Sequence, residues 1–289
     1  MMTKKPTPPF PQQPINPPGI EAKMDPKPQY KAESYKAAGK LTNKVALITG
    51  GDSGIGRSVA LLFAREGADV ALVYLPEEQK DAEQIKQDIE AFGRHVLLIP
   101  GDLTQVEFCE ELIQNTLKHF KKIDILVNNA AFQKHRPDLD AVSIEQWDHT
   151  FTSNIYSYYY LCKFAVPHMK PGSVIINTGS ITGLEGSKEL LDYSSTKGAI
   201  HAFTKSLAKN LVDKGIRVNC VAPGPVWTPL NPAERKGEAI KDFGSDTAMG
   251  RPAQPEELAP AYVFLASNAD SGYISGLVLP VLGGDTVAG

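Results

Sequence analysis

The sequence lacks a tract rich in Lys or Arg, a long apolar run and a cysteine set typical of disulfide scaffolds. Its 30 Lys and Arg residues are balanced by 33 Asp and Glu residues, for a net charge of −3, which argues against nucleic acid as the main partner. No apolar run reaches the roughly 20 residues of a membrane-spanning helix, so we expect no membrane association. The N-terminal lysines are followed by prolines, not by the apolar core of a signal peptide.

Cysteine and histidine usage argues against two further kinds of site. The three cysteines, Cys109, Cys162 and Cys220, are odd in number and lie in apolar segments. We therefore expect reduced, buried thiols in a cytoplasmic protein rather than a disulfide framework. The six histidines show no paired ligand spacing, so we expect no metal site.

Residues 1–40 differ in composition from the rest of the chain. Nine prolines lie between Pro6 and Pro28, with few large apolar side chains among them. Such a stretch cannot form a packed core by itself, so composition favours a disordered tail. The alternative is an ordered arm lying along the folded body or a neighbouring subunit. We expect the folded domain to span residues 41–289.

From residue 41 onwards, short β-rich runs alternate with longer helical patterns. The predicted strands are 45–49, 70–74, 96–99, 123–128, 173–178, 217–222 and 277–281. Each is nearly continuously apolar, which indicates a parallel sheet covered on both faces. The pattern predicts a single doubly wound α/β (Rossmann) domain with a seven-stranded parallel sheet. Ligands of such a fold bind beyond the carboxyl ends of the strands.

A glycine-rich turn, residues 50–56, joins the first predicted strand to a helix. Its glycines, Gly50, Gly54 and Gly56, let an anion approach the backbone and the unpaired N–H groups of the helix N-terminus. No Gly-Lys-Ser/Thr sequence closes the turn, so it is not a Walker loop. The turn therefore predicts a dinucleotide site rather than an ATP site.

Tyr193 and Lys197 stand four residues apart in a predicted helix, so their side chains share one face. Tyr159 and Lys163 have the same spacing, and context separates the two pairs. Tyr193 follows Ser180, which ends a predicted strand at the ligand edge, by thirteen residues. The Tyr159 pair lies in a tyrosine-rich helix, where packing against the sheet or a subunit is the expected use.

Taken together, these motifs resemble those of the short-chain dehydrogenase/reductase family. The matching residues are Thr49-Gly50-x-x-x-Gly54-x-Gly56, Asn128-Asn129-Ala130, Asn154, Ser180, Tyr193-x-x-x-Lys197 and Pro223-Gly224. The resemblance covers roughly residues 41–289. The proline-rich leader and the Tyr-Leu-Pro-Glu-Glu after the second strand resemble bacterial glucose/ribitol-dehydrogenase-like or aldehyde-reductase-like members. The family resemblance also implies a homotetramer built through the long helices and the C-terminal strand.

The family resemblance implies an NAD(P)-dependent oxidoreductase that interconverts a carbonyl and an alcohol. Tyr193 would be the acid/base and Lys197 its electrostatic partner, while Ser180 would bind the substrate oxygen and Asn154 would position a relay water. A free tyrosine has a pKa of about 10, and lowering it by ~3 units requires ~4 kcal/mol of preferential phenolate stabilisation. We expect Lys197 and the oxidised nicotinamide to supply it. The alternatives are a non-catalytic dinucleotide-sensing protein and, further removed, a methyltransferase on a related sheet.

The cofactor-binding residues follow from the same match. They are Gly50, Ser53, Gly54, Ile55 and Gly56 at the phosphates, Tyr74 after the second strand, Asp102 and Leu103 at the adenine, Asn128 and Ala130 beside the ribose, Pro223, Gly224, Val226 and Thr228 near the carboxamide, and Tyr193 and Lys197. Asn128 has an alternative role as a structural amide that ties strands together.

Two departures from the family pattern bear on the cofactor. Ala131 stands where the family usually has glycine, and we expect a slightly shifted loop. Ser53 and Leu75 supply no basic side chain for a 2′-phosphate, and Glu77 would repel one. The sequence therefore favours NAD over NADP and leaves dual use open. The Pro-, Gly- and charge-rich segment 229–250 is predicted to be a lid over the substrate, whose identity the sequence leaves open.

Overall fold

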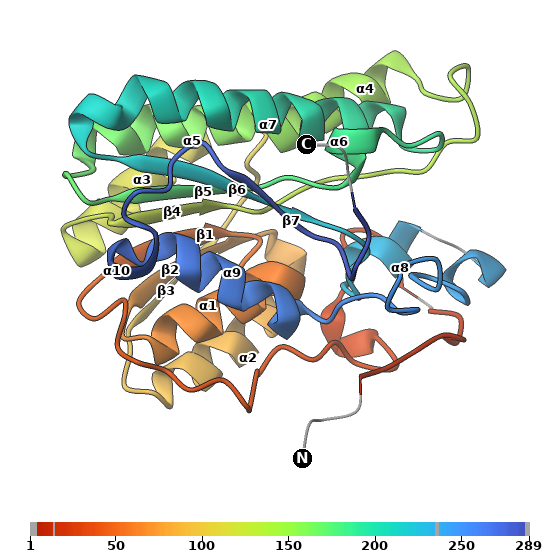
Figure 1. Cartoon of the computed structure of the whole chain (residues 1–289), viewed down its shortest axis with the longest axis horizontal. Coiled ribbons are helices and arrows are strands. Elements are labelled where there is room, and N and C mark those ends of the chain that lie inside the picture. The colour runs from red at the N-terminus through yellow and green to blue at the C-terminus, as the bar shows by residue number, and fades with distance from the viewer. Residues whose placement is uncertain (1–4, 14, 235–236, 287–289) are drawn as a thin grey trace.

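The computed structural model describes residues 5–13, 15–234 and 237–286. Seven parallel strands form one sheet in the order β3-β2-β1-β4-β5-β6-β7, which confirms the predicted doubly wound fold (Figure 1). The strands are β1 Val45–Thr49, β2 Asp69–Tyr74, β3 Val96–Pro100, β4 Ile125–Asn128, β5 Val174–Thr178, β6 Arg217–Pro223 and β7 Val278–Val281. All seven overlap the predicted ranges, because runs of β-branched and apolar residues fit a sheet buried on both sides.

Helices cover both faces of the sheet (Figure 1). The helices packed on one face are α1 Gly54–Arg65, α2 Gln79–Glu90 and α9 Pro255–Ala266, and those on the other are α3 Val106–Phe120, α5 Ser157–Ala165 and α7 Leu191–Leu211. Each face has its own apolar core. The shorter helices are α4 Ile144–Phe151, α6 Thr182–Glu185, α8 Leu230–Glu234 and α10 Asn268–Ser271, with 3₁₀ turns η1 Glu21–Lys23, η2 Pro76–Glu78, η4 Val166–His168, η5 Val212–Lys214 and η6 Gly237–Ile240.

The long helix that the sequence predicts from Ser143 to about Met169 is interrupted. α4 begins as expected, with the Ser143 side chain accepting a hydrogen bond from the Gln146 N–H. A π-helical turn, η3 Thr152–Tyr156, then separates α4 from α5. Single π-helical turns are frequent at functional sites, and this one contains the predicted site residue Asn154.

The strand order reverses beside β1, which pairs with β2 on one side and β4 on the other. The loops after β1 and β4 therefore diverge to opposite faces and leave a crevice between them, where ligands of this fold bind. The glycine turn 50–56 borders that crevice, as its position after the first strand predicts.

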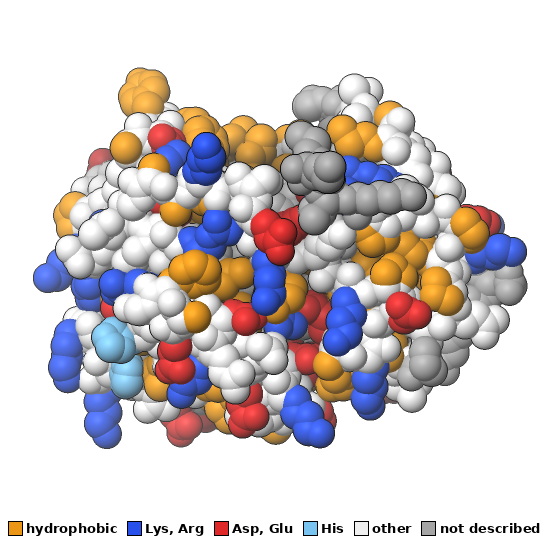
Figure 2. Space-filling view, turned by 90° about the horizontal axis from the view of Figure 1, so that it is seen from below, with side chains coloured by type: hydrophobic (Ala, Val, Ile, Leu, Met, Phe, Trp, Pro, Cys, Tyr) orange, Lys and Arg blue, Asp and Glu red, His pale blue; other side chains and the backbone are white. Residues whose placement is uncertain are grey.

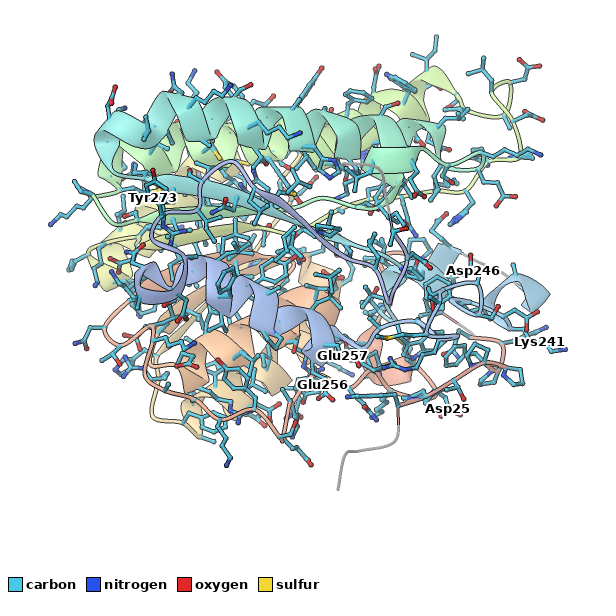
Figure 3. The ribbon with its side chains drawn as sticks, viewed as in Figure 1. Asp25, Lys241, Asp246, Glu256, Glu257 and Tyr273 are labelled. Atoms are coloured by element: carbon cyan, nitrogen blue, oxygen red, sulfur yellow. The ribbon has the colours of Figure 1, made fainter. Side chains whose placement is uncertain are left out.

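The described residues of the N-terminal segment lie against the folded body. The chain runs along the outside of α1, α2 and α9 (Figure 1), and its apolar residues Phe10, Ile15 and Met24 are buried. Their partners are Trp227 and residues of the segment 229–250, which contains α8 and η6. In Figure 3, Asp25 of the arm and Lys241 of that segment lie at the same end of the molecule. Composition could not show these contacts, because their partners lie more than 200 residues away in sequence.

The surface on the side of the arm carries Lys, Arg, Asp and Glu side chains interspersed with one another (Figure 2). Within the described part of the chain, no helix is long and apolar enough to cross a membrane. Cys109, Cys162 and Cys220 are all buried with free thiols, as expected.

We predict that Gly56→Ala lowers the free energy of unfolding by at least about 1–3 kcal/mol, the range for overpacked sites. A Cβ there would lie 1.9 Å from the Gly50 carbonyl oxygen, so the first turn of α1 must move. Gly198→Ala is the matched control, since its Cβ meets nothing closer than 3.5 Å and alanine favours a helix. Urea titration should show a lower midpoint only for Gly56→Ala. Equal midpoints would contradict the close approach.

Candidate active site

A cavity of about 860 Å³ opens at the carboxyl edge of the sheet. Most of the predicted site residues line it, namely Gly50, Ser53, Gly54, Ile55, Tyr74, Asp102, Leu103, Ala130, Ser180, Tyr193, Lys197, Pro223, Gly224, Val226 and Thr228. They come from loops that are distant in sequence, and the parallel sheet brings them to one edge. Gly56, Asn128 and Asn154 do not line it.

Tyr193 and Lys197 lie on α7 and face the cavity together. Tyr193 is 8% exposed and Lys197 is 1% exposed. The Lys197 ammonium lies 5.3 Å from the centre of the Tyr193 ring, and it donates a hydrogen bond to the Thr178 carbonyl at 2.8 Å. By contrast, Tyr159 of the competing pair is 49% exposed on α5 and does not line the cavity.

Burial dominates the titration of both groups. It lowers the pKa of Lys197 to about 8 and raises the pKa of Tyr193 to about 12, while a hydrogen bond with Ser180 acts to lower the pKa of Tyr193. The shift of the phenol is opposite in direction to the lowered pKa that the sequence predicts. The reason is physical: removing a phenolate from water disfavours it, and the Lys197 ammonium is hydrogen-bonded to a carbonyl oxygen.

Ser180 is held by its neighbours at the end of β5. Its hydroxyl oxygen accepts hydrogen bonds from the Thr182 N–H at 3.1 Å and the Thr182 hydroxyl at 3.0 Å. Its backbone N–H donates to Nε2 of His201 at 3.4 Å. Burial, followed by the charge of Lys197, lowers the pKa of His201 to about 4, so this imidazole accepts as a neutral group near pH 7. Sequence reasoning missed His201, although it follows Lys197 by four residues on the same face of α7.

The Asn154 side chain is fully buried and does not line the cavity. Its amide oxygen accepts from the Phe132 N–H at 2.7 Å, and its nitrogen donates to the Phe132 carbonyl at 2.8 Å and to Thr196 at 3.1 Å. These bonds join the π-helical turn to the loop after β4 and to α7. The side-chain amide therefore has a structural use, and the water-positioning role expected of Asn154 stays a prediction.

Asn128 is fully buried, and its amide donates to Asn177 Oδ1 at 2.9 Å. It therefore ties β4 to β5, as in the alternative structural role. The neighbouring Asn129, a part of the motif that was not predicted as a site residue, donates to the Thr49 and Gly50 carbonyls at 3.0 and 3.2 Å. It holds the glycine turn to the loop after β4.

The glycine turn is built for close approach. Gly50 and Gly54 have φ values of +60° and +51°, in the left-handed region that favours glycine. The backbone at Ala131 stays outside that region, so alanine fits there without strain.

Acidic groups line the cavity at the glycine turn and after β2, namely Asp52 and Glu78. Asp52 is 1% exposed, and burial raises its pKa well above the usual range. Burial also raises the pKa of Glu78 to about 7. Lys197 is the single Lys or Arg among the described residues that line the cavity. Neither Asp52 nor Glu78 was predicted as a site residue, because only the fold brings them together.

Comparison with known proteins agrees with this geometry. A family model described as Enoyl-(Acyl carrier protein) reductase matches residues 50–286. The chain belongs to the short-chain dehydrogenase/reductase family. It is therefore an NAD(P)-dependent oxidoreductase.

Its relatives include proteins with named activities. The chain is 53% identical to the uncharacterized oxidoreductase YhdF of Bacillus subtilis, covering 95% of this chain and 94% of the relative. It is 47% identical to NADPH-dependent aldehyde reductase 1 of Arabidopsis thaliana, covering 93% and 96%. It is also 47% identical to glucose and ribitol dehydrogenase of Daucus carota, covering 96% and 97%. These names match the predicted subgroup.

A solved structure has the same fold. The short-chain dehydrogenase of Burkholderia cenocepacia in complex with NADP superposes with a TM-score of 0.79 at 30% identity, covering 85% of this chain and 98% of that one. In the part of the chain that the structure describes, no group of three or more His, Cys, Asp or Glu side chains could hold a metal ion.

We predict that Lys197→Met stabilises the enzyme near pH 7. Between pH 8 and 10.5 the unfolded chain binds the lysine proton and the folded chain does not, so stability rises with pH across that window. Below pH 8 the buried ammonium destabilises the fold by up to roughly 3 kcal/mol, at about 1.36 kcal/mol per pKa unit.

Removing the ammonium should therefore raise the free energy of unfolding at pH 7, and the gain should shrink towards pH 10. Urea titrations of wild type and Lys197→Met at pH 7, 8.5 and 10 measure this. A stability difference that does not change with pH would contradict the burial effect.

Proposed function

We propose that this enzyme interconverts an aldehyde or ketone and an alcohol, with Tyr193 as the general acid and base. The observation that carries the proposal is the buried Tyr193–Lys197 pair, which faces the same cavity as Ser180 and the glycine turn. Hydride transfer to a carbonyl carbon needs a proton donor at the oxygen. The Tyr193 hydroxyl lines the cavity and can donate this proton.

In the direction of reduction, the Tyr193 hydroxyl donates its proton to the carbonyl oxygen. A pKa near 12 keeps the phenol protonated at neutral pH, as this direction requires. In the direction of oxidation the phenolate takes the alcohol proton, and the nearby Lys197 ammonium favours that anion electrostatically. Ser180 binds the substrate oxygen and stabilises the charge that develops there.

The residues present fit a nicotinamide dinucleotide. The glycine turn brings bare backbone to the N-terminus of α1, where a diphosphate is stabilised by N–H groups and the helix dipole. Gly50, Ser53 and Ile55 would hold the diphosphate, Asp102 and Leu103 the adenine, and Val226 and Thr228 the carboxamide. When bound, the nicotinamide supplies the hydride and, in its oxidised form, a positive charge.

The π-helical turn offers a route for protons. The N–H of Ser157 bonds to the carbonyl of Thr152, five residues earlier, so the turn departs from the regular helical bonding pattern. Because the Asn154 side chain is used by Phe132 and Thr196, we infer that backbone carbonyls of this turn hold the relay water rather than the Asn154 amide.

The segment 229–250 forms the proposed substrate lid. Its residues Leu230, Ala233 and Phe243 line the cavity. Two bonds connect it to the loop after β4, from Gln133 to Asn231 at 3.2 Å and from the His135 N–H to Glu234 at 3.1 Å. Arg235 and Lys236 lie outside the described residues. The homotetramer remains a prediction from the family resemblance, and the cytoplasmic location remains a prediction from the sequence composition. The exposed Tyr156 and Tyr159 are consistent with a subunit contact.

We predict that Tyr193→Phe lowers kcat/KM for carbonyl reduction by about 10²–10⁴-fold, the range for loss of a general acid, with dinucleotide affinity nearly unchanged. Tyr159→Phe is the matched control, because it removes the same hydroxyl from the competing Tyr–Lys pair, and should leave the rate unchanged. A panel of aldehydes, sugars and polyols with NAD(H) and NADP(H) gives the rates. Undiminished reduction by Tyr193→Phe would rule out the acid/base role.

We further propose that the enzyme prefers NAD(H) over NADP(H). The acidic Asp52 and Glu78 and the apolar Leu75 line the cavity after β1 and β2, and a 2′-phosphate there would meet no basic side chain from these positions. The names of the Arabidopsis and Burkholderia relatives point to NADP(H), so the comparison of both cofactors is decisive.

Leu75→Arg should shift the kcat/KM ratio at least tenfold towards NADP(H), because the guanidinium would pair with the 2′-phosphate. Leu75→Gln, polar but uncharged, is the control and should shift the ratio much less. Steady-state kinetics with both cofactors at one ionic strength measures the ratio. A wild-type enzyme that is faster with NADP(H) would overturn the preference.

A further inference from the structure

The N-terminal arm reaches the dinucleotide cavity. Pro17 and Pro18 are among its lining residues. Three residues further on, the buried Glu21 accepts a hydrogen bond from the N–H of Gly54 at 2.6 Å. Gly54 begins α1, so a carboxylate from the arm binds the first N–H of the helix that carries the glycine turn.

The charge of Glu21 is neutralised by Arg57. The two side chains form a buried ion pair at 2.8 Å, and the arm holds the guanidinium from the other side as well. The Arg57 guanidinium lies 3.8 Å from the centre of the Tyr30 ring and donates to the Tyr30 hydroxyl at 2.9 Å. A cation stacked on an aromatic ring and paired with a carboxylate is held in a fixed geometry. The first turn of α1 is thereby fixed between two parts of the arm.

The backbone of Glu21 is itself anchored. The Asp81 carboxylate of α2 accepts from the N–H groups of Glu21 and Ala22 at 2.7 and 3.3 Å. Helix α2 thus positions Glu21, and Glu21 in turn contacts the first N–H of α1. The carboxylate is held on both sides, as a residue that positions the turn must be.

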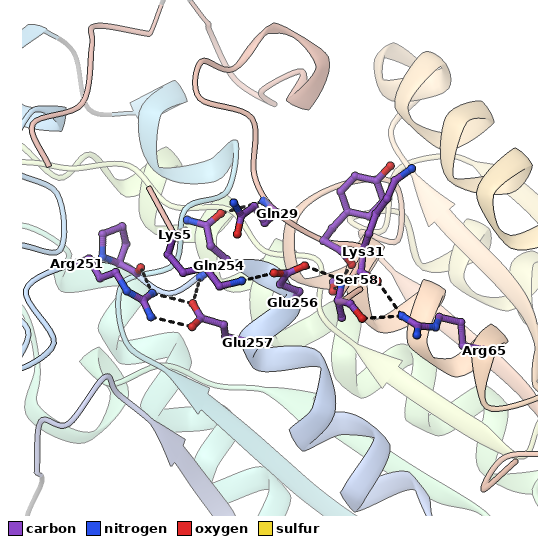
Figure 4. Close-up of polar contacts among 12 residues, drawn as sticks. Lys5, Gln29, Lys31, Ser58, Arg65, Arg251, Gln254, Glu256 and Glu257 are labelled. Atoms are coloured by element: carbon purple, nitrogen blue, oxygen red, sulfur yellow. Dashed lines mark hydrogen bonds and ion pairs between the residues drawn. The ribbon is translucent and has the colours of Figure 1, made fainter. Parts of the chain in front are cut away.

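Further contacts hold the arm at two places, beside Trp227 and at the N-terminus of α9. Phe10 stacks on Trp227 with 4.1 Å between ring centres, and Trp227 donates to the Pro26 carbonyl at 2.7 Å, beside the lid. At α9, Gln254 accepts from the Gln29 N–H at 2.9 Å and Glu256 from the Ala32 N–H at 2.6 Å (Figure 4). Glu256 also pairs with Lys5.

We propose that the N-terminal arm is a working part of the dinucleotide site. Pro17 and Pro18 form one wall of the site, and Glu21 and Arg57 are positioning residues that hold the first turn of α1 in the geometry that receives the diphosphate. The proposal rests on the proposed function, since it requires that the cavity binds a dinucleotide. The Glu21 carboxylate accepts the hydrogen bond of the Gly54 N–H. The following N–H groups of the turn are then the ones that would bind the diphosphate.

Glu21→Ala tests the positioning role in the full-length chain. It should weaken NAD(H) and NADP(H) binding at least tenfold in a calorimetric titration. Glu21→Gln keeps an oxygen acceptor for the Gly54 N–H and should restore affinity to within about threefold of wild type. Arg65→Gln is the matched control, because Arg65 also lies on α1 and holds the arm through the Lys31 and Ala32 carbonyls, far from the glycine turn. It should leave the dissociation constants unchanged.

Tighter binding by Glu21→Ala would overturn the proposal, because it would mean that Glu21 competes with the diphosphate for the helix N-terminus. Equal weakening in Arg65→Gln would also overturn it, because the effect would then not depend on the glycine turn.

Wild-type enzyme provides a second test that needs no folded variant. Lys23 and Lys31 of the arm are exposed, so trypsin can report whether the arm is docked. If the arm and the dinucleotide stabilise each other, saturating NADH or NADPH should slow cleavage at these lysines severalfold. Unchanged cleavage despite calorimetric binding would refute the arm proposal alone. If wild type bound neither dinucleotide, the proposed function would fail as well.

Discussion

The burial of the Lys197 ammonium is the constraint on which the active site depends. A charge that is 1% exposed is tolerated only where hydrogen bonds replace water, and the Thr178 carbonyl at the end of β5 supplies one. Such a group destabilises the fold, so its presence at a ligand edge indicates function rather than stability. Tyr193, Ser180 and the neutral His201 are arranged around it. The π-helical turn and the Asn154 bonds to Phe132 and Thr196 fix the helices that carry this group.

The cavity joins two chemically different ends. At one end lie the Lys197 ammonium and the Tyr193 hydroxyl, the proposed proton donor. At the other, the α1 N-terminus attracts anions, and the acidic side chains of Asp52 and Glu78 also line the cavity. In the proposed binding mode, this asymmetry would orient a dinucleotide with its diphosphate at the helix N-terminus and its nicotinamide near Tyr193.

The arm and the segment 229–250 both line the cavity and share one apolar cluster with Trp227. Phe10, Met24, Trp227 and Phe243 pack together there. Segments from both ends of the chain therefore enclose a site whose catalytic residues come from the middle. A proline-rich segment suits this use, since its restricted backbone loses less conformational entropy on docking than a flexible one.

The sequence by itself determined the fold and most of the cavity lining. These features are local patterns: the apolar strands, the glycine spacing and the Tyr193-x-x-x-Lys197 pair. Their residues are close together in the sequence, so the sequence alone reveals them. It also separated this pair from Tyr159 and Lys163, because Ser180 marks the ligand edge.

The tertiary structure decided what depends on distant partners. Asn128 and Asn154 were assigned from motifs, yet their amides are used by Asn177, Phe132 and Thr196, which lie 22 to 49 residues away. The pKa of Tyr193 was expected to fall and instead rises, because burial is a property of the packed molecule. The docking of the N-terminal arm also depends on distant partners. Its composition favours disorder, but Glu21 contacts Arg57 of α1 and Phe10 contacts Trp227 after β6, and only the folded sheet brings these partners together.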